Sequence, residues 1–327
     1  MPAETTATTA ATEAWRARPV VGVGLINKDF VAVAEHVTRD EKSSALAYFE
    51  QAGGPVPVAL TAMARLGLEQ APVAIGVVGD DAAGDDVCRM LSADGVDASR
   101  VVHAGTTETS KSLVLLDARD GTRTLANYAG SLPPLELTPA HEAAIRAAGL
   151  VHLDGRDLPA CLAAARLAKA SGAWVSIDLG TMRPGREELL SLCDIILASR
   201  KGGAGAFPDA HDDPAEQARR FLALGARVAG VTLAHEGVVV AAWEARGGTP
   251  VRLPAFHVER VADTCGAGDT FHGGFLWAYR AGMEPARAAD FAQATVALRI
   301  AKHGNRAGLP TRAAVEALLA DPPRRNE

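Results

Sequence analysis

Residues 263–270 read DTCGAGDT, and the apolar, small-residue stretch 271–279 follows directly. Two glycines, Gly266 and Gly268, allow the backbone to bend tightly there and to expose its N–H groups. The following stretch predicts a helix, whose first turn leaves further N–H donors unpaired at the positive end of the helix dipole. This arrangement is typical of an anion site, and it suits phosphate.

Asp269 lies in the first turn of that predicted helix, so its carboxylate comes within reach of a bound phosphate. A carboxylate at this point can accept the proton of an attacking hydroxyl, as phosphoryl transfer requires. An aspartate at a helix start also has an ordinary structural use, as a cap or as a partner of the helix dipole. A cap would need no pair of glycines before it, so the residues favour the catalytic interpretation.

Residues 263–275 (DTCGAGDTFHGGF) resemble the C-terminal signature of the ribokinase-like (PfkB) sugar kinases. The resemblance implies that Asp269 is the general base of the reaction. It also implies that Gly266, Ala267 and Gly268 form the anion hole for the transferred phosphate.

The same resemblance extends over residues 19–320. Residues 20–29 (VVGVGLINKD) are similar to the first strand and the sugar-binding aspartate of the family, and residues 76–97 to its second conserved block. The resemblance implies one kinase domain over residues 19–322. Its fold would be the α/β ribokinase-like fold, with a mostly parallel central sheet flanked by helices and a small β-sheet lid over the sugar site.

Length and composition agree with one large intracellular domain. The chain has 327 residues, of which 48% are hydrophobic, so apolar material for a core is ample. A formal net charge of −6 argues against a nucleic-acid or anionic-membrane surface. Four scattered cysteines fit a reducing cytoplasm better than a zinc site or a disulfide framework. Residues 1–18, rich in Ala and Thr, predict a disordered tail, and no apolar run is long enough to predict a membrane span.

Apolar runs of strand length alternate with Ala- and Leu-rich helical patterns along the chain. Continuously apolar strands that alternate with helices predict a parallel sheet covered on both faces. Residues 29–50 and 103–128 break this pattern and predict the small sheet, which in ribokinase-like enzymes forms the lid and often mediates dimerisation; a homodimer is therefore expected. The predicted strands are 20–26, 73–78, 113–117, 150–153, 174–179, 195–198, 228–233 and 238–243, and the predicted helices are 55–66, 85–94, 158–171, 214–224, 267–281 and 285–302.

The resemblance assembles the sugar site from residues that are distant in sequence. Asp29 would accept hydrogen bonds from two sugar hydroxyls, while Gly53 and Gly54 would let the backbone approach the ring. A carboxylate on a surface loop is the structural alternative for Asp29. Asn27 follows an apolar strand, and capping of a turn explains it as well as ligand contact does.

The nucleotide side matches the family less closely. Thr232 lies where the family has Thr-x-Gly facing the ATP phosphates, but Ala234 takes the glycine position and Gly237 is expected to supply the flexibility. Residues 199–202 (SRKG) lack the glutamate of the Asn-x-x-Glu motif that organises Mg²⁺ through water, as ketohexokinases and sulfofructose kinases also do. The expected ATP-binding residues are Ser199, Thr232, Gly237, Thr264, Gly266 and Gly268, and no residue is assigned to the metal ion.

Three residues resemble the sulfonate contacts of sulfofructose kinases, namely Lys42, Asn127 and Arg156. Each alone is ordinary, because a lone lysine is usually solvated and an arginine after a strand is usually a surface ion-pair partner. Together, a lysine and an arginine suit a tetrahedral oxyanion. The expected reaction is ATP- and Mg²⁺-dependent phosphorylation of the primary hydroxyl of a ketohexose-type furanose, such as 6-deoxy-6-sulfofructose or fructose.

Other functions remain open at this stage. A ribokinase or a nucleoside kinase of the same family is one alternative, and a sugar sensor on an inactive kinase fold is another, disfavoured by the intact Asp269. An NAD-binding oxidoreductase would rest on residues 22–27 (GVGLIN), where Asn27 replaces the third glycine of the fingerprint. Residues 180–185 (GTMRPG) have the glycine spacing of a P-loop without its lysine and hydroxyl residue.

Two further side chains are near the predicted anion hole. A helix N-terminus stabilises a thiolate, so Cys265 is predicted to alkylate faster than the other three cysteines. The histidines show no metal-ligand spacing and are predicted to be structural, including His272, which follows the anion hole.

Overall fold

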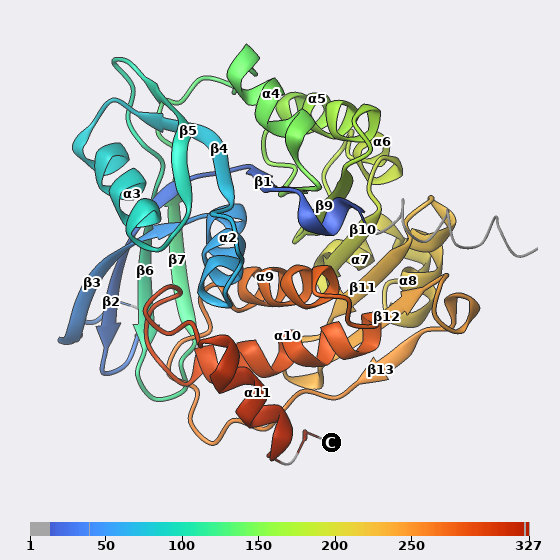
Figure 1. The fold of residues 1–327 in the computed structure, drawn as a ribbon. Helices are drawn as coiled ribbons and strands as arrows, with labels where there is room; N and C mark the ends of the chain where they lie inside the picture. The colour runs from blue at the N-terminus through green and yellow to red at the C-terminus, as the bar shows by residue number, and fades with distance from the viewer. Residues whose placement is uncertain (1–13, 39, 324, 327) are drawn as a thin grey trace, which may run out of the picture.

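The computed structural model describes residues 14–38, 40–323 and 325–326, and it contains two β-sheets (Figure 1). The large sheet has nine strands, and a separate small sheet has four. In spatial order, the large sheet consists of β13 (Val251–Leu253), β12 (Val238–Ala242), β11 (Val228–Thr232), β10 (Ile195–Ser199), β9 (Trp174–Leu179), β8 (Leu150–Leu153), β1 (Val20–Val23), β4 (Val73–Gly79) and β5 (Asp97–Ala104).

Neighbouring strands of the large sheet are parallel from β5 to β11, whereas β12 is antiparallel to both of its neighbours, β11 and β13. β8 and β9 are buried along their whole length, which is why they appear in the sequence as continuous apolar runs with the predicted bounds. The predicted α/β fold with a mostly parallel sheet is therefore confirmed. The carboxyl ends of these strands meet at one edge, where ligands of such sheets bind.

Helices cover both faces of the large sheet, and each layer has its own apolar core (Figure 1). α9 crosses the middle of one face, where it packs against α2 and α10. On this side lie α2 (Pro55–Arg65), α3 (Ala82–Ala93), α9 (Ala267–Arg280), α10 (Pro285–Ile300) and α11 (Arg312–Ala320). On the other side lie α4 (Pro139–Ala147), α5 (Leu158–Ala170), α6 (Glu187–Ser191), α7 (Arg200–Ala206) and α8 (Pro214–Ala223).

The small sheet has the strand order β3 (Ala45–Gly53), β2 (Asn27–Ala34), β6 (Lys111–Asp117) and β7 (Arg123–Tyr128). β2 and β6 are parallel, and the outer pairs are antiparallel. It forms where the irregular polar pattern predicted it, with different bounds. The predicted first strand 20–26 is shorter in the structure, because the chain leaves the large sheet after Val23 and enters the small sheet at Asn27. Residues 103 and 104 belong to β5 of the large sheet.

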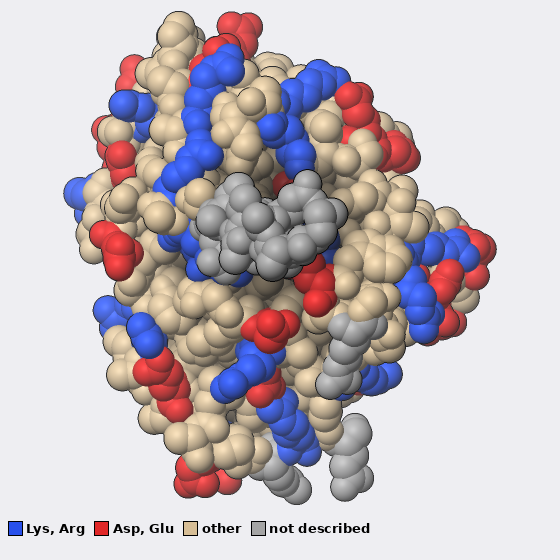
Figure 2. Space-filling view, turned by 45° about the vertical axis from the view of Figure 1, so that its right-hand side comes forward, with Lys and Arg blue, Asp and Glu red and all other residues tan. Residues whose placement is uncertain are grey.

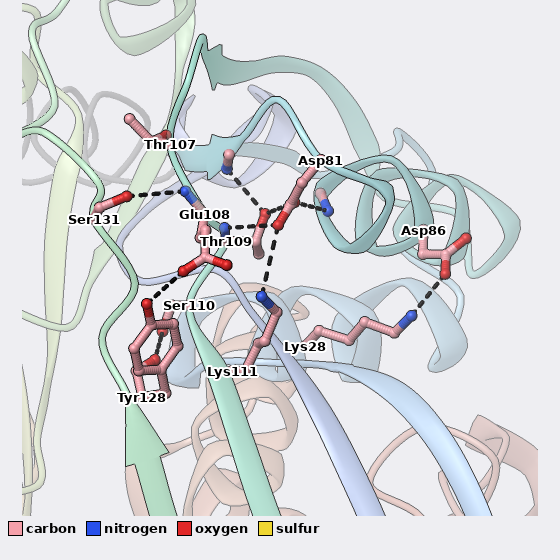
Figure 3. A network of polar contacts seen from close by, with 12 residues as sticks. Lys28, Asp81, Asp86, Thr107, Glu108, Thr109, Ser110, Lys111, Tyr128 and Ser131 are labelled. Carbon is pink, nitrogen blue, oxygen red and sulfur yellow. Dashed lines mark hydrogen bonds and ion pairs between the residues drawn. The ribbon is translucent and has the colours of Figure 1, made fainter.

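A polar network attaches the small sheet to α3 at the start of β2 and β6 (Figure 3). Lys28 is nearly buried and pairs with Asp86 of α3 and Glu50 of β3, each at 2.6 Å. Lys111 of β6 lies 3.7 Å from Asp81, the N-cap residue of α3. Partly buried ion pairs of this kind are specific in geometry. They hold the small sheet against α3.

Part of the predicted tail of residues 1–18 is folded in the structure. Residues Ala14–Ala17 form a short 3-10 turn, and Trp15 within it is 3% exposed. The Trp15 ring stacks on Trp174 with 4.7 Å between the ring centroids. Burial of an aromatic ring stabilises the folded chain enough to order this turn. Residues 1–13 lie outside the described part of the chain.

Basic and acidic side chains are interspersed over most of the face that Figure 2 shows. This distribution agrees with the modest net charge of −6. None of the helices in the described ranges is long and apolar enough to span a lipid bilayer.

Candidate active site

Residues 263–266 form the loop before α9, called the anion loop below. It ends in Gly266, which has a left-handed backbone (φ 73°) directly before α9 begins. A Cβ atom at this position would come within 2.8 Å of Cβ of Asn305, so a side chain does not fit. A Cβ at Gly268 would meet no atom within 4 Å. The first-turn N–H groups of α9 have no intrahelical acceptor. They border open space, and together they can bind a phosphate.

Asp263 fixes the start of this loop from inside the protein. Its Oδ2 accepts hydrogen bonds from Arg299 of α10 at 3.2 Å and from the Gly304 amide at 2.8 Å. Its Oδ1 accepts one from the amide of Cys265 at 2.7 Å. Both members of the Asp263–Arg299 pair are buried. This pair therefore holds the anion loop on α10 through charge-assisted hydrogen bonds.

Asp269 is half-exposed as a residue, but protein groups surround its carboxyl group. Burial and the neighbouring carboxylate of Asp178 raise the pKa of Asp269 to about 7, while His272 and Arg123 act in the opposite direction. A carboxyl group with this pKa is ionised above neutral pH and can accept a proton there. Below neutral pH it is protonated and cannot act as a base.

Arg123 of β7 brings a positive charge to the anion loop, although nothing in the sequence pattern marks it as a neighbour of that loop. Its Nη1 donates to the hydroxyl oxygen of Thr264 at 3.0 Å and also to the carbonyl oxygen of that residue. The hydroxyl group of Thr264 in turn donates to the carbonyl oxygen of Gly121 at 3.1 Å. Thr264, expected to contact ATP, therefore uses its hydroxyl group to link the loop to the small sheet.

Asp29 is buried on β2 at 5% exposure, so the alternative of a surface-loop carboxylate is wrong. Asn27 donates to its Oδ1 at 2.7 Å. Gln51 and Asn305 donate to its Oδ2 at 3.4 and 3.5 Å. Burial raises the pKa of Asp29, and hydrogen bonds from Ser112, Asn27 and Gln51 partly offset that rise. Gln51 lies two residues before Gly53 of the predicted glycine pair. Nothing in the sequence pattern, however, marks Gln51 or Asn305 as a neighbour of Asp29.

The glycine pair lies against this carboxylate. A Cβ atom at Gly53 would come within 2.4 Å of Oδ1 of Asp29, so only glycine leaves room for it. Gly54 has a φ of 106°, and a Cβ there would meet the carbonyl oxygen of Leu25 at 2.1 Å. Gly53 therefore lies against Asp29, and Gly54 is the N-cap residue of α2.

Asn127 joins the same polar cluster through Ser112 of β6. The Ser112 hydroxyl donates to Oδ1 of Asn127 at 3.1 Å and accepts from Asn27 at 2.7 Å. Asn27 therefore binds neighbouring side chains at the start of β2 rather than capping a turn, and the structure brings it together with Asn127 and Asp29. Ser112 carried no signal in the sequence.

Arg156 is exposed and lies three residues after the end of β8. Asp154 connects its backbone to that of Leu25. Oδ1 of Asp154 accepts from the Arg156 amide, and Oδ2 accepts from the Leu25 amide, both at 2.8 Å. Lys42 lies in the exposed loop between β2 and β3. Among the described residues, no hydrogen bond or ion pair engages either the Lys42 ammonium or the Arg156 guanidinium, and none joins the two.

The other residues expected on the nucleotide side lie at the ends of neighbouring strands. Ser199 caps α7 by accepting from the Gly202 amide at 3.0 Å, and its hydroxyl donates to Gly180. Thr232 ends β11, next to Ser199 in the sheet register. Ala234, at the position of the family's glycine, has a left-handed φ of 55°. Gly237 has a φ of 106° and no room for a Cβ, so it supports a fixed turn rather than a flexible one.

Neither alternative nucleotide motif forms its expected structure. After residues 22–27 the chain continues as strand β2, whereas a dinucleotide fingerprint requires a helix there. After residues 180–185 the Arg186 side chain is buried and donates to the carbonyl oxygens of Thr181 and Gly155, so it cannot contact a phosphate. The NAD-binding alternative is therefore wrong.

The prediction of a reactive Cys265 is also wrong. Cys265 is 7% exposed and packs beneath the apolar inner face of the small sheet. Burial and the charges of Asp29 and Asp263 raise the pKa of its thiol to about 12. The dipole of α9 does not offset this cost, because the thiolate would be buried next to two carboxyl groups.

The pfkB family carbohydrate kinase profile matches residues 17–312. The chain therefore belongs to the pfkB family of carbohydrate kinases, and it is a sugar kinase with the ribokinase-like fold. A sensor without kinase activity does not agree with this assignment.

Curated relatives agree with the family. The chain is 30% identical over 306 residues to the ATP-dependent ribose-1-phosphate kinase of Halopiger xanaduensis, covering 92% of this chain and 98% of the relative. It is 31% identical to fructokinase-1 of Oryza sativa, covering 94% and 99%. A crystal structure of a putative ribokinase from Agrobacterium tumefaciens has the same fold, with a TM-score of 0.83 at 24% identity, covering 93% of this chain and 97% of that one.

Proposed function

We propose that this protein is an ATP- and Mg²⁺-dependent kinase, formed by one domain over residues 19–322, that phosphorylates the primary hydroxyl of a furanose with a negatively charged group at its far end. A ketohexose of the 6-deoxy-6-sulfofructose type is the preferred substrate. The observation that carries this proposal is the position of Arg156. Asp154 accepts hydrogen bonds from the backbone amides of both Arg156 and Leu25, and the Arg156 guanidinium is exposed. Four free cysteines accord with a cytoplasmic enzyme.

In this proposal the sugar lies between the small sheet and the carboxyl edge of the large sheet. Asp29, held by Asn27, Gln51 and Asn305, accepts hydrogen bonds from two sugar hydroxyls. The missing side chain at Gly53 leaves the space in which the carboxylate lies. Binding by oriented acceptors presents the primary hydroxyl to Asp269.

Asp269 accepts the hydroxyl proton while the hydroxyl oxygen forms its bond to the γ-phosphorus of ATP. The bond from that phosphorus to the β,γ-bridging oxygen breaks, and ADP leaves. Gly266, Ala267 and Gly268 present backbone N–H groups to the negative charge of the transferred group, and the positive end of α9 adds to this stabilisation. Arg123, bound to Thr264, supplies a fixed positive charge beside them.

The open space above Gly268 fits a phosphate group, which is the part of ATP that the described residues accommodate most directly. Within the described ranges there is no group of three or more His, Cys, Asp or Glu side chains that could hold a metal ion. Mg²⁺ would therefore be held mainly by phosphate oxygens and water, as is common for this ion. It would neutralise charge between the phosphates. Ser199, Thr232 and Gly237 line the adjoining strand ends in this proposal.

Replacement of Arg156 by leucine is expected to lower kcat/KM for 6-deoxy-6-sulfofructose by roughly 10- to 150-fold, because a charge-assisted contact is worth about 1.5–3 kcal/mol. Activity on neutral fructose should remain almost unchanged, because the reacting end is untouched. Steady-state ADP release measures both sugars. Arg166→Leu, which removes an exposed arginine of α5, is the matched control. Equal losses on both sugars, or a wild-type preference for fructose, would contradict the role of Arg156.

The substrate itself is tested by coupled ADP release over a panel of sugars. The panel contains 6-deoxy-6-sulfofructose, fructose, fructose phosphates, ribose, ribose-1-phosphate and nucleosides. Ribose-1-phosphate is the second candidate, because it is also an anionic furanose and a 30% identical relative is named for it. Highest kcat/KM on ribose, a nucleoside or fructose would overturn the anionic-furanose proposal while leaving the sugar-kinase assignment intact.

The outer face of the small sheet supports a homodimer. Leu113 and Tyr48 are 61% and 60% exposed, and Leu46 and Leu115 are 63% and 43% exposed. The strand register aligns Tyr48 with Ala32, and Ala32 with Leu115, so these side chains share one face of the sheet. A contiguous apolar face of this kind is unusual on a monomer. A second copy of the same sheet is apolar in the same way and can cover it symmetrically.

Leu113→Asp is expected to convert the proposed dimer into a monomer of 33.9 kDa in light scattering after size exclusion, because a buried unpaired carboxylate destabilises the interface. Leu224→Asp, at an exposed leucine after α8, is the matched control and should leave the mass unchanged. A monomeric wild-type protein, or a dimer in the Leu113 variant, would contradict the interface.

A further inference from the structure

A cluster of four titratable side chains lies beneath the anion loop, at the carboxyl ends of β8 and β9 and in the first turns of α9. Asp269 and His272 come from α9, Asp178 from β9 and His152 from β8. His272 and His152 are 3% and 0% exposed, and Asp178 is 9% exposed. Only Asp269 has an assigned role in the proposed reaction, so the other three require an explanation.

The contacts connect these groups in a line. Nε2 of His272 lies 3.3 Å from Oδ1 of Asp178. Asp269 precedes His272 by three residues on α9, so their side chains lie on the same face of the helix. The carboxyl group of Asp178 is close enough to Asp269 for its charge to raise the pKa of Asp269. Two neighbouring carboxyl groups repel each other when both are ionised, unless a cation is present. His272 contacts Asp178 and is such a cation when it is protonated.

His152 lies behind His272, with 5.7 Å between the ring centroids. Its Nδ1 pairs with the hydroxyl group of Ser176 at 2.9 Å. Complete burial lowers the pKa of His152 to about 3, so its ring is neutral and Nε2 can accept. The nitrogens left without partners are Nε2 of His152 and Nδ1 of His272. A protonated His272 carries a donor at Nδ1, so the two rings are complementary when His272 alone is charged.

We propose that His272 is a positioning residue: as an imidazolium paired with Asp178, it fixes the charge and orientation of that carboxylate, and thereby the readiness of Asp269 to accept the proton of the sugar hydroxyl. This inference rests on the proposed role of Asp269 as the base. Burial lowers the pKa of His272, but contact with Asp178 raises it overall. Burial raises the pKa of Asp178, but contact with His272 lowers it overall, so each partner favours the charged form of the other.

The remaining charged groups around the cluster are few. Arg123 of β7 and Asp29 of β2 act on Asp269 from the small sheet, and Asp154, after β8, interacts with Asp178. The next residues of α9, Gly273 and Gly274, pack against α2 and α10. The neighbouring residues there do not titrate: Ala59, Ala62, Ala292 and Thr295. Among the described residues, His272 is the histidine whose charge acts on Asp269.

The first test needs no substrate. In wild-type protein with isotope-labelled histidine, the NMR signal of His272, assigned by its loss in His272→Gln, should be that of an imidazolium at neutral pH. In Asp178→Asn the pKa of His272 should fall by about one unit or more, because a contacting opposite charge shifts a pKa by about 1–3 units. In Asp269→Asn the pKa of His272 should also fall, because the charge of Asp269 raises it. The response to Asp269→Asn is decisive, because coupling between two titrating sites is reciprocal.

The second test uses the sugar that the screen identifies as substrate. His272→Gln keeps a donor toward Asp178 and removes the charge, so the acid limb of kcat/KM should move upward by about one pH unit. At pH values well below the acid limb, kcat/KM of this variant should be roughly tenfold lower than that of the wild type. His152→Asn is the matched control: it replaces a buried neutral imidazole, keeps an amide in the place of Nδ1, and should leave the limb in position.

The outcomes separate this inference from the proposed function. If no sugar is phosphorylated but the pKa of His272 falls in Asp269→Asn, the charge coupling stands and the proposed function fails. If a sugar is phosphorylated and His272 titrates identically in wild type and Asp269→Asn, or the limb is unmoved in His272→Gln, His272 is not the positioning residue. Equal shifts in His272→Gln and His152→Asn would also overturn it, because a general packing defect would explain both.

Discussion

Asp269→Asn is expected to lower kcat by roughly 10²- to 10⁴-fold, which is the usual contribution of a general base. Asparagine has nearly the same shape as aspartate but cannot accept the proton of the sugar hydroxyl. The backbone N–H groups of the anion loop are unaffected, so ATP affinity, measured by calorimetry, should change little. Steady-state ADP release gives kcat for the variant and the wild type.

Asp85→Asn provides the matched control for this substitution. Asp85 is also an aspartate in the first turn of a helix, but it is exposed on α3 and far in sequence from the anion loop. If Asp269 acted only through the helix dipole, both variants would lose about 0.3–1 kcal/mol of stability and neither would lose its turnover. Near-normal kcat in Asp269→Asn would remove Asp269 from the role of base.

Arg299→Leu is expected to lower the free energy of unfolding by about 3–5 kcal/mol, because it leaves a buried carboxylate without its counter-charge. Asp263 would retain only the amide hydrogen bonds from Cys265 and Gly304. Urea denaturation followed by circular dichroism measures the loss. The anion loop starts at Asp263, so the variant that remains folded should also bind ATP more weakly.

The double variant Asp263→Asn/Arg299→Leu tests the electrostatic cause. Removal of both charges together should cost less than Arg299→Leu alone, because no unpaired charge remains buried. Arg312→Leu is the control on the surface: its exposed pair with Glu316 on α11 is worth no more than about 1 kcal/mol. Equal destabilisation by Arg299→Leu and the double variant would attribute the effect to packing of the arginine stem.

The strands and helices that the sequence predicts best are those buried on both faces. β8 and β9 have the predicted bounds, and α9 ends one residue before its predicted end, because continuous apolar runs and a glycine start leave little ambiguity. α4, α11 and β5 were not predicted. α11 fully buries only Val315, while Leu318 and Leu319 are partly buried against the core. β7 is exposed along its whole length, so it has no continuous apolar run in the sequence.

The residues of the candidate site also fall into those that the sequence predicts and those that it does not. Residues that form a local motif were predicted together, because the glycine turn, the helix start and Asp269 are adjacent in the chain. Gly53 and Asp29 were predicted through the resemblance, and the structure brings them into contact. Gln51, Ser112, Asn305 and Arg123 were missed. Each is an ordinary polar residue whose place depends on pairing between distant segments.

The sequence by itself determined the fold class, the anion loop and the position of Asp269, because these depend on local backbone geometry and on the alternation of apolar strands with helices. Only the tertiary structure decided the proton affinities of the side chains around that loop. Burial beneath the small sheet raises the pKa of the Cys265 thiol, contrary to expectation from the helix dipole alone. Burial and the charge of Asp178 raise the pKa of Asp269 to about 7. Desolvation and through-space charge depend on which segments pack together, and that is a property of the folded chain.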